Sequence, residues 1–111
     1  MITRIDFTDE PIEAGQERIL RAWTDAEPLV VAIECFREPP TPARMRPCAE
    51  CGSFHVTSGE AVTVAASLTA FEGRAGYLLV RVTDARRDYR EFRLDVSTTE
   101  GGENMQGGLY A

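Results

Sequence analysis

The clearest hydrophobic pattern in the chain is an alternation of apolar and small polar residues over residues 61–71, AVTVAASLTAF. A period of two is typical of a strand with one buried face, and Gly59 and Gly73 supply turn residues on either side. We therefore expect a strand over residues 61–71. Its inward residues would be Val62, Val64, Ala66, Leu68 and Ala70.

Two later segments repeat this alternation, at residues 77–83 (YLLVRVT) and 89–96 (YREFRLDV). A polar stretch at residues 84–88 separates them and reads as a hairpin connection. Because strands joined by short turns pair antiparallel, we expect three consecutive antiparallel strands between residues 61 and 96. The inward residues of the last two would be Leu78, Val80, Val82, Phe92, Leu94 and Val96.

The first third of the chain gives one clear strand and one ambiguous segment. Residues 29–36 (LVVAIECF) are apolar and rich in β-branched residues, which indicates a strand, and residues 2–7 form a weaker strand candidate. On the stronger strand, Leu29, Val31, Ile33 and Cys35 would share the inward face. Residues 13–24 (EAGQERILRAWT) fit either a helix with a partial apolar stripe or a strand.

Together with this strand pattern, the length and composition of the chain indicate its fold class. The chain has 111 residues, of which 43% are hydrophobic and 27% charged, values typical of one globular domain. We expect an all-β fold, an antiparallel β-sandwich of about seven strands over residues 1–97. Residues 37–59 would form one long loop, and residues 98–111, with four glycines in fourteen positions, a flexible C-terminal arm.

The net charge of the chain narrows the classes of partner that we expect it to bind. A net charge of −6 disfavours binding to nucleic acid or to a membrane surface, because both are anionic. The first ten residues, MITRIDFTDE, lack the apolar segment of a signal peptide, which predicts synthesis in the cytoplasm without secretion. The expected partners are therefore other proteins, including further copies of the chain.

The long loop carries the one cluster with distinctive chemistry. Cys48 and Cys51, followed by Gly52, have the spacing of a zinc knuckle, in which two thiolates bind one ion from a tight turn. His55 would be a third ligand and Cys35 a fourth, which gives a structural zinc site. The alternatives are free thiols, with Cys35 as a small core residue, or a disulfide or redox pair between the two loop cysteines.

Two other places suggest contacts with a protein partner. Arg86, Arg87 and Arg90 lie at the expected hairpin tip, where they would either be solvated or dock on an acidic surface. Leu109 and Tyr110 form an apolar tip on the C-terminal arm and would dock on a neighbouring subunit if the arm is ordered. Catalysis finds little support, because His55 is the only histidine and no phosphate-binding glycine loop is present.

Short motifs in the chain resemble those of bacterial and phage immunoglobulin-like domains. They are Ala14-Gly15-Gln16, Thr24-Asp25-Ala26-Glu27-Pro28-Leu29, and Gly76-Tyr77 through Asp84-Ala85. The resemblance implies an immunoglobulin-like sandwich and a non-enzymatic structural or interaction module. It further suggests a virion component of a tailed phage, such as a capsid decoration or tail accessory protein that contacts capsid or tail subunits. The alternative is a zinc-binding cytoplasmic protein, a regulator or metal-dependent enzyme, centred on the loop cysteines.

Overall fold

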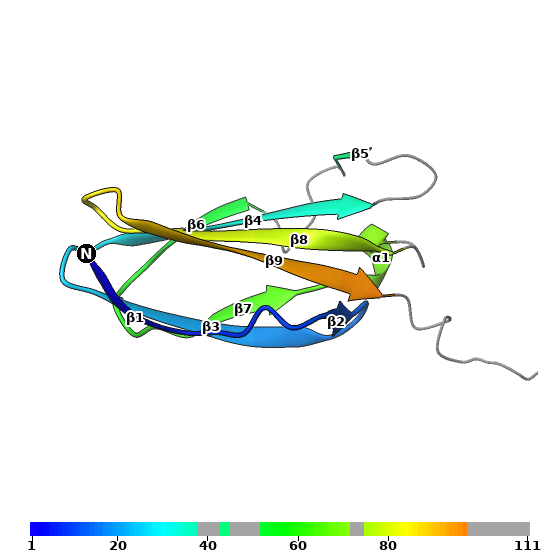
Figure 1. The fold of residues 1–111 in the computed structure, drawn as a ribbon, viewed down its shortest axis with the longest axis horizontal. Helices are drawn as coiled ribbons and strands as arrows, with labels where there is room; N and C mark the ends of the chain where they lie inside the picture. The colour runs from blue at the N-terminus through cyan, green and yellow to red at the C-terminus, as the bar shows by residue number, and fades with distance from the viewer. Residues whose placement is uncertain (38–42, 45–51, 72–74, 98–111) are drawn as a thin grey trace, which may run out of the picture.

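The computed structural model describes residues 1–37, 43–44, 52–71 and 75–97. Over these residues the chain forms two β-sheets that pack face to face as a sandwich (Figure 1). The expected all-β class is confirmed, and the only helix among the described residues is the four-residue α1 (Leu68–Phe71). No helix in this part of the chain is long and apolar enough to cross a membrane.

The smaller sheet has three antiparallel strands in the order β1 (Ile2–Asp6), β3 (Glu17–Thr24) and β7 (Val62–Ala65). The ambiguous segment at residues 13–24 is therefore a strand, preceded by the short β2 (Ile12–Glu13). Its period of two decides this, because Leu20 and Ala22 are buried in the core while Ile19 and Arg21 are exposed.

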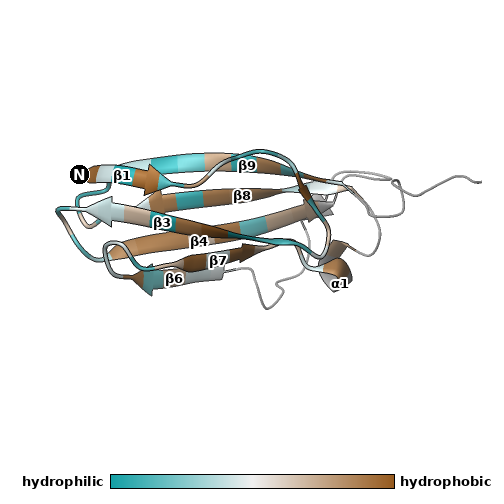
Figure 2. Cartoon of the chain, turned by 90° about the horizontal axis from the view of Figure 1, so that it is seen from below, coloured by the Kyte–Doolittle hydropathy of each residue, from teal (hydrophilic) through white to brown (hydrophobic). Residues whose placement is uncertain are grey.

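The larger sheet has the order β2, β9 (Tyr89–Ser97), β8 (Gly76–Thr83) and β4 (Leu29–Arg37). Two short strands, β5 (Ala43–Arg44) and β6 (Gly52–Val56), pair antiparallel with successive parts of the far edge of β4. Because β4 has a strand on each edge, it lies inside the sheet, and apolar residues cover nearly its whole length (Figure 2).

The core lies between the two sheets and contains the expected inward residues of the clear strands. The buried members from β4, β8 and β9 are Leu29, Val31, Ile33, Cys35, Leu78, Val80, Val82, Leu94 and Val96. Phe92 is only partly buried and packs against this cluster from its edge. The alternation in these three segments therefore predicted the core face correctly.

The expected strand over residues 61–71 is wrong in its second half. β7 ends at Ala65, and the chain then turns into α1, where Leu68 is 56% exposed and Phe71 is fully buried. The reason lies in the partner strand β3, which begins at Glu17. The backbone before it turns at Gly15, so β3 does not extend far enough to pair with residues beyond the end of β7. Without a ladder partner, the helical turn places the larger Phe71 ring in the core instead of Leu68.

Two expectations about connectivity also need correction. β7 pairs with β3 in the smaller sheet and not with β8, so the three strands between residues 61 and 96 are not consecutive neighbours. The expected loop at residues 37–59 contains β6, whose residues pair with Leu29 to Ile33 of β4. Both errors arise because pairing across the sandwich depends on tertiary packing, which local alternation does not encode.

Candidate functional site

The β8–β9 hairpin, which carries the predicted arginines, closes one end of the sandwich. The N–H of Asp84 donates to the carbonyl of Asp88 at 2.9 Å, and the N–H of Arg87 donates to the carbonyl of Asp84 at 3.0 Å. Arg87 has a φ of +69°, which is uncommon for a residue with a side chain. Figure 1 shows the N-terminus beside this hairpin.

A buried carboxylate organises the hairpin. Oδ1 of Asp84 accepts bonds from the backbone N–H groups of Arg86 (2.9 Å) and Asp88 (3.0 Å). Oδ2 accepts from the Thr24 hydroxyl at 3.1 Å and lies 3.2 Å from the Met1 ammonium, which also pairs with Asp25. Because four donors converge on the Asp84 carboxylate, its role is to fix the turn and to hold β1 against it.

The same bonds set the ionisation of the hairpin. Burial acts to raise the pKa of Asp84, but bonds from the Asp88 backbone, the Met1 ammonium and the Thr24 hydroxyl hold that pKa below its ordinary value. The pKa of Asp88 is also lowered, by the Ile2 N–H that donates to it at 2.8 Å and by Arg90. Both carboxylates are therefore more stable ionised in the folded chain than in the unfolded chain.

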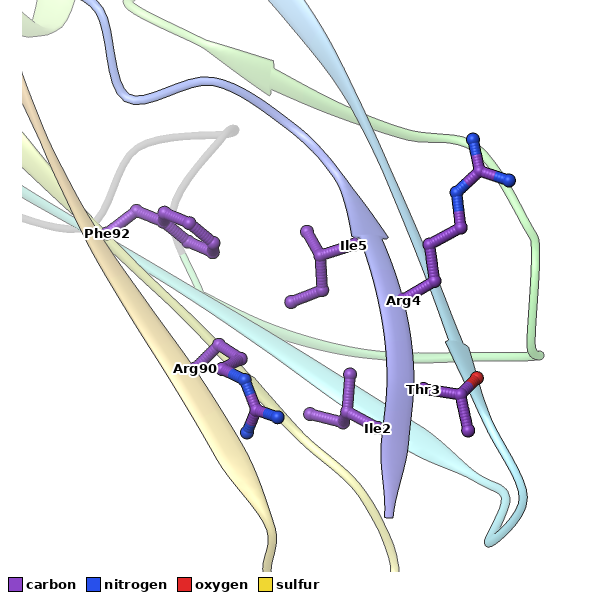
Figure 3. Close-up of a pocket in the computed structure, with 6 residues that line it drawn as sticks. All are labelled: Ile2, Thr3, Arg4, Ile5, Arg90 and Phe92. Carbon is purple, nitrogen blue, oxygen red and sulfur yellow. The ribbon is translucent and has the colours of Figure 1, made fainter.

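The three predicted arginines do not form one patch. Arg86 and Arg87 are exposed at the hairpin tip. Arg90 belongs to β9 and lies on the same strand face as the inward-facing Phe92 and Leu94, so it points to the opening between the two sheets (Figure 3). Its Nη1 donates to Oδ1 of Asp88 at 3.0 Å and to the carbonyl of Tyr89 at 2.9 Å.

A groove lies along this opening, between β1 of one sheet and β9 of the other. It has a volume of about 280 Å³ and is lined by Ile2, Thr3, Arg4, Ile5, Arg90 and Phe92. Figure 3 shows Ile2 and Ile5 pointing from β1 toward Phe92 and Arg90 on β9. An edge-to-face contact between Phe7 and Phe92, with ring centroids 5.2 Å apart, lies next to the groove. The groove thus has an apolar floor with Arg90 at its rim, while Arg4, which also lines it, directs its guanidinium away to the Trp23 ring, 4.7 Å from the ring centroid.

The outer face of the larger sheet carries aromatic rings and arginines in alternation. The ring of Tyr77 stacks on Phe36 with centroids 4.9 Å apart, and the Arg93 guanidinium lies 3.9 Å from the Tyr77 centroid. The Arg81 guanidinium lies 4.7 Å from the Tyr89 ring. We call this set, with the half-buried Leu79 between them, the aromatic–arginine face. It is defined by Phe36, Tyr77, Leu79, Arg81, Tyr89 and Arg93.

The aromatic–arginine face did not emerge from the sequence as a site, although its signal is present there. The outward positions of residues 77–83 and 89–96 alternate with the core residues, and they hold two tyrosines and two arginines. What the sequence lacks is the register, in which Tyr77 lies opposite Phe36 on one side and Asp95 on the other. Only that pairing brings the rings and guanidinium groups together.

The structure separates two of the four predicted zinc ligands. Cys35 is 4% exposed and belongs to the core between the sheets. His55 pairs with Val30, which alternates with the buried Leu29 and Val31, so His55 lies on the outer face of the same sheet. Cys35 and His55 therefore lie on opposite faces and are not brought together.

The other two predicted zinc ligands and the two predicted docking residues of the C-terminal arm lie outside the described part of the chain. These are Cys48, Cys51, Leu109 and Tyr110. Among the described residues, no group of three or more His, Cys, Asp or Glu side chains is placed to hold a metal ion. A zinc site centred on the two loop cysteines stays a prediction, as does docking through the C-terminal arm.

The chain was compared with known proteins at three levels. No protein-family model matches it, and no match was found among curated proteins or among solved structures. Its two surfaces, the groove and the aromatic–arginine face, are therefore interpreted from their own geometry.

Proposed function

We propose that this chain is a non-enzymatic interaction module with an immunoglobulin-like arrangement of strands. The pairing order supports the proposal, because β1, β3 and β7 form one sheet and β4, β8 and β9 the other. The N-terminal segment is divided between the sheets, with β1 on β3 and β2 on β9. Immunoglobulin-like sandwiches distribute their strands over two antiparallel sheets in a comparable way.

The observation that carries the function is the aromatic–arginine face. Protein interfaces are enriched in tyrosine, phenylalanine and arginine, and the residues that dominate binding energy are drawn from tyrosine, tryptophan and arginine. On this face the arginines lie over tyrosine rings, which holds both side chains in place before a partner arrives. A preordered surface loses less side-chain entropy on binding.

The charges of the face fit a protein partner of mixed composition. Arg81 pairs with Glu91 at 3.2 Å, and Arg93 pairs with Asp95 at the same distance. The cations are thus matched by neighbouring anions, so the face does not select for a strongly charged partner. We extend the proposal to a subunit of a multi-copy assembly, of which the tailed-phage virion suggested by the sequence motifs is one setting.

Binding to a particle tests this proposal with a matched pair of variants. Leu79 and Ile19 are aliphatic residues on outward positions of internal strands, one on each sheet. We expect the wild-type chain and Ile19→Glu to co-sediment with particles purified from the source organism, and Leu79→Glu to be lost from the pellet. Size-exclusion chromatography with light scattering would confirm that both variants stay folded.

Two results would overturn the proposal. One is that Leu79→Glu sediments as well as the wild type, because a buried carboxylate at the centre of an interface cannot be neutral. The other is that the wild-type chain stays in the supernatant as a monomer.

A further inference from the structure

We infer that the groove between β1 and β9 binds an extended peptide strand of a partner protein, which carries a branched aliphatic residue and an acidic residue two positions apart. The inference is independent of the aromatic–arginine face, which lies on a different side of the larger sheet. It rests on an edge of β9 that no described strand covers, on the apolar floor of the groove and on the position of Arg90.

The first step concerns the backbone of β9. Along a strand, successive residues direct their N–H and C=O groups to opposite edges. The carbonyl of Ser97 accepts from the N–H of Ala14, which follows β2, at 3.0 Å, so odd-numbered residues of β9 point to the edge away from β8. Glu91 therefore points its backbone groups to that edge, and no described strand pairs with β9 there.

The second step is that the chain already uses this edge elsewhere. β2 pairs parallel with β9 through Ile12 opposite Val96 and Glu13 opposite Ser97. The side chain of Ile12 is 3% exposed, so it plugs the opening between the two sheets at that end. Phe7, from the same N-terminal segment, packs on Phe92, and the groove occupies the opening beyond that contact, toward Arg90.

The third step defines the side chains of the partner. The floor of Ile2, Ile5 and Phe92 is apolar, and about 280 Å³ lies just below the usual size range of small-molecule pockets. It suits a single aliphatic side chain opposite Phe92. Arg90 lies two residues away on the same face of β9, about 7 Å along the strand. Among the described residues, its bonds to Asp88 and Tyr89 both use Nη1, which leaves Nη2 and Nε to donate to a carboxylate.

The test uses the full-length chain and two synthetic peptides, acetyl-TETITET-amide and acetyl-TKTITKT-amide. Each has its charged residues two positions from isoleucine on both sides, so binding does not depend on strand direction. In an NMR titration at 0.15 M salt, we expect the glutamate peptide to shift the amide resonances of Glu91 and Phe92. We also expect it to bind at least threefold more tightly than the lysine peptide, although the chain carries a net charge of −6.

Charge-changing variants make the test specific. In Arg90→Glu the preference should invert, so that the lysine peptide binds more tightly, and in Arg90→Gln it should disappear. Arg86→Gln is the matched control, because Arg86 is an exposed arginine of the same hairpin outside the groove, and there the preference should remain. The dispersion of the amide spectrum shows that each variant is folded.

Three outcomes would overturn the inference. In the first, the wild-type chain binds the lysine peptide as tightly as the glutamate peptide. In the second, the glutamate peptide shifts resonances away from β9 and β1, or shifts none. In the third, Leu109→Ser with Tyr110→Ser moves the Glu91 resonance without any peptide, which would assign the groove to the chain's own C-terminal arm.

Discussion

Replacing Gly59 with alanine tests how the turn between β6 and β7 packs against the only tryptophan of the chain. Gly59 has a φ of +83°, and its N–H donates to the carbonyl of Ala22 at 2.7 Å. A Cβ at this position would lie 2.9 Å from Nε1 of Trp23 and 3.4 Å from its Cδ1. The substitution therefore combines backbone strain with displacement of a half-buried ring.

The size of the effect follows from these two contributions. A left-handed backbone costs an L residue about 1–2 kcal/mol, and overpacking a filled site costs about 1–3 kcal/mol. Alanine also lowers the entropy of the unfolded chain, which offsets about 0.4–1 kcal/mol. We expect Gly59→Ala to lower the free energy of unfolding by about 2–4 kcal/mol.

Gly52→Ala is the matched control for this substitution. Gly52 also has a positive φ, of +126°, but an added Cβ would meet no atom within 4 Å. Strain alone then remains, and the expected loss is about 1 kcal/mol. Urea unfolding followed by far-UV circular dichroism measures both losses, and the fluorescence of Trp23 reports on the displaced ring.

A second background separates the packing contribution from the strain. Trp23→Ala removes the ring atoms that lie nearest to Gly59. In that background, Gly59→Ala should cost no more than the Gly52→Ala control. Equal losses for the two glycine variants in the wild-type background, or a loss that Trp23→Ala leaves unchanged, would refute the packing argument.

Four further predictions concern the hairpin, the core and the loop. Arg87→Gly should raise the unfolding free energy by about 0.5–1 kcal/mol, because glycine adopts a positive φ without strain; a lower melting temperature would contradict this. Since the folded pKa of Asp84 is lowered, its contribution to stability is present above the ordinary value of 3.8 and is lost as the pH falls through the folded pKa. Urea midpoints measured from pH 6 to pH 2 should therefore fall less steeply in Asp84→Asn than in the wild type. Leu78→Ala, at a fully buried position, should cost about 2–5 kcal/mol, whereas Leu68→Ala, at a position 56% exposed, should cost at most about 0.5 kcal/mol; similar losses in thermal unfolding would show that α1 packs differently. If elemental analysis finds zinc in the purified chain, Cys35→Ala should leave the zinc content unchanged, because this side chain faces the core; loss of zinc in that variant would place the ion between the sheets.

Alternation predicted β4 and β8 because each buries one face along its length, and β9 because Leu94 and Val96 bury the same face of its second half. Leu78, Val80 and Val82 are each fully buried, and burial of one strand face gives the sequence a hydrophobic period of two. The same rule failed at residues 67–71, where alternation continues in the sequence but the partner strand does not. The sequence did not predict β6, because four of its five residues are exposed and the segment has little alternation of apolar and polar residues.

The candidate surfaces depend on information that no local pattern holds. Arg90 was grouped by sequence with Arg86 and Arg87, yet its place on β9 separates it from them and directs it to the groove. Tyr77 and Phe36 are far apart in the chain, and they stack only because β8 pairs with β4 in one register. A shift of β8 by one residue against β4 would turn Tyr77 to the core face and away from Phe36.

The divided N-terminal segment explains why the sandwich has a groove at all. β1 completes the smaller sheet and β2 covers the end of β9, so the segment crosses the opening between the sheets beyond the groove, where Phe7 packs on Phe92 and Ile12 is buried. No described strand pairs with that edge of β9 before the crossing, and an unpaired edge is a risk for aggregation that charged residues reduce. Arg90 and Glu91 occupy this stretch, and Arg90 is the charge that faces the groove. The side chain that deters unspecific strand pairing would thus also select a partner strand. A carboxylate near the aliphatic residue could accept from the Nε and Nη2 groups of Arg90, which its bond to Asp88 does not use, whereas an ammonium there would meet a like charge.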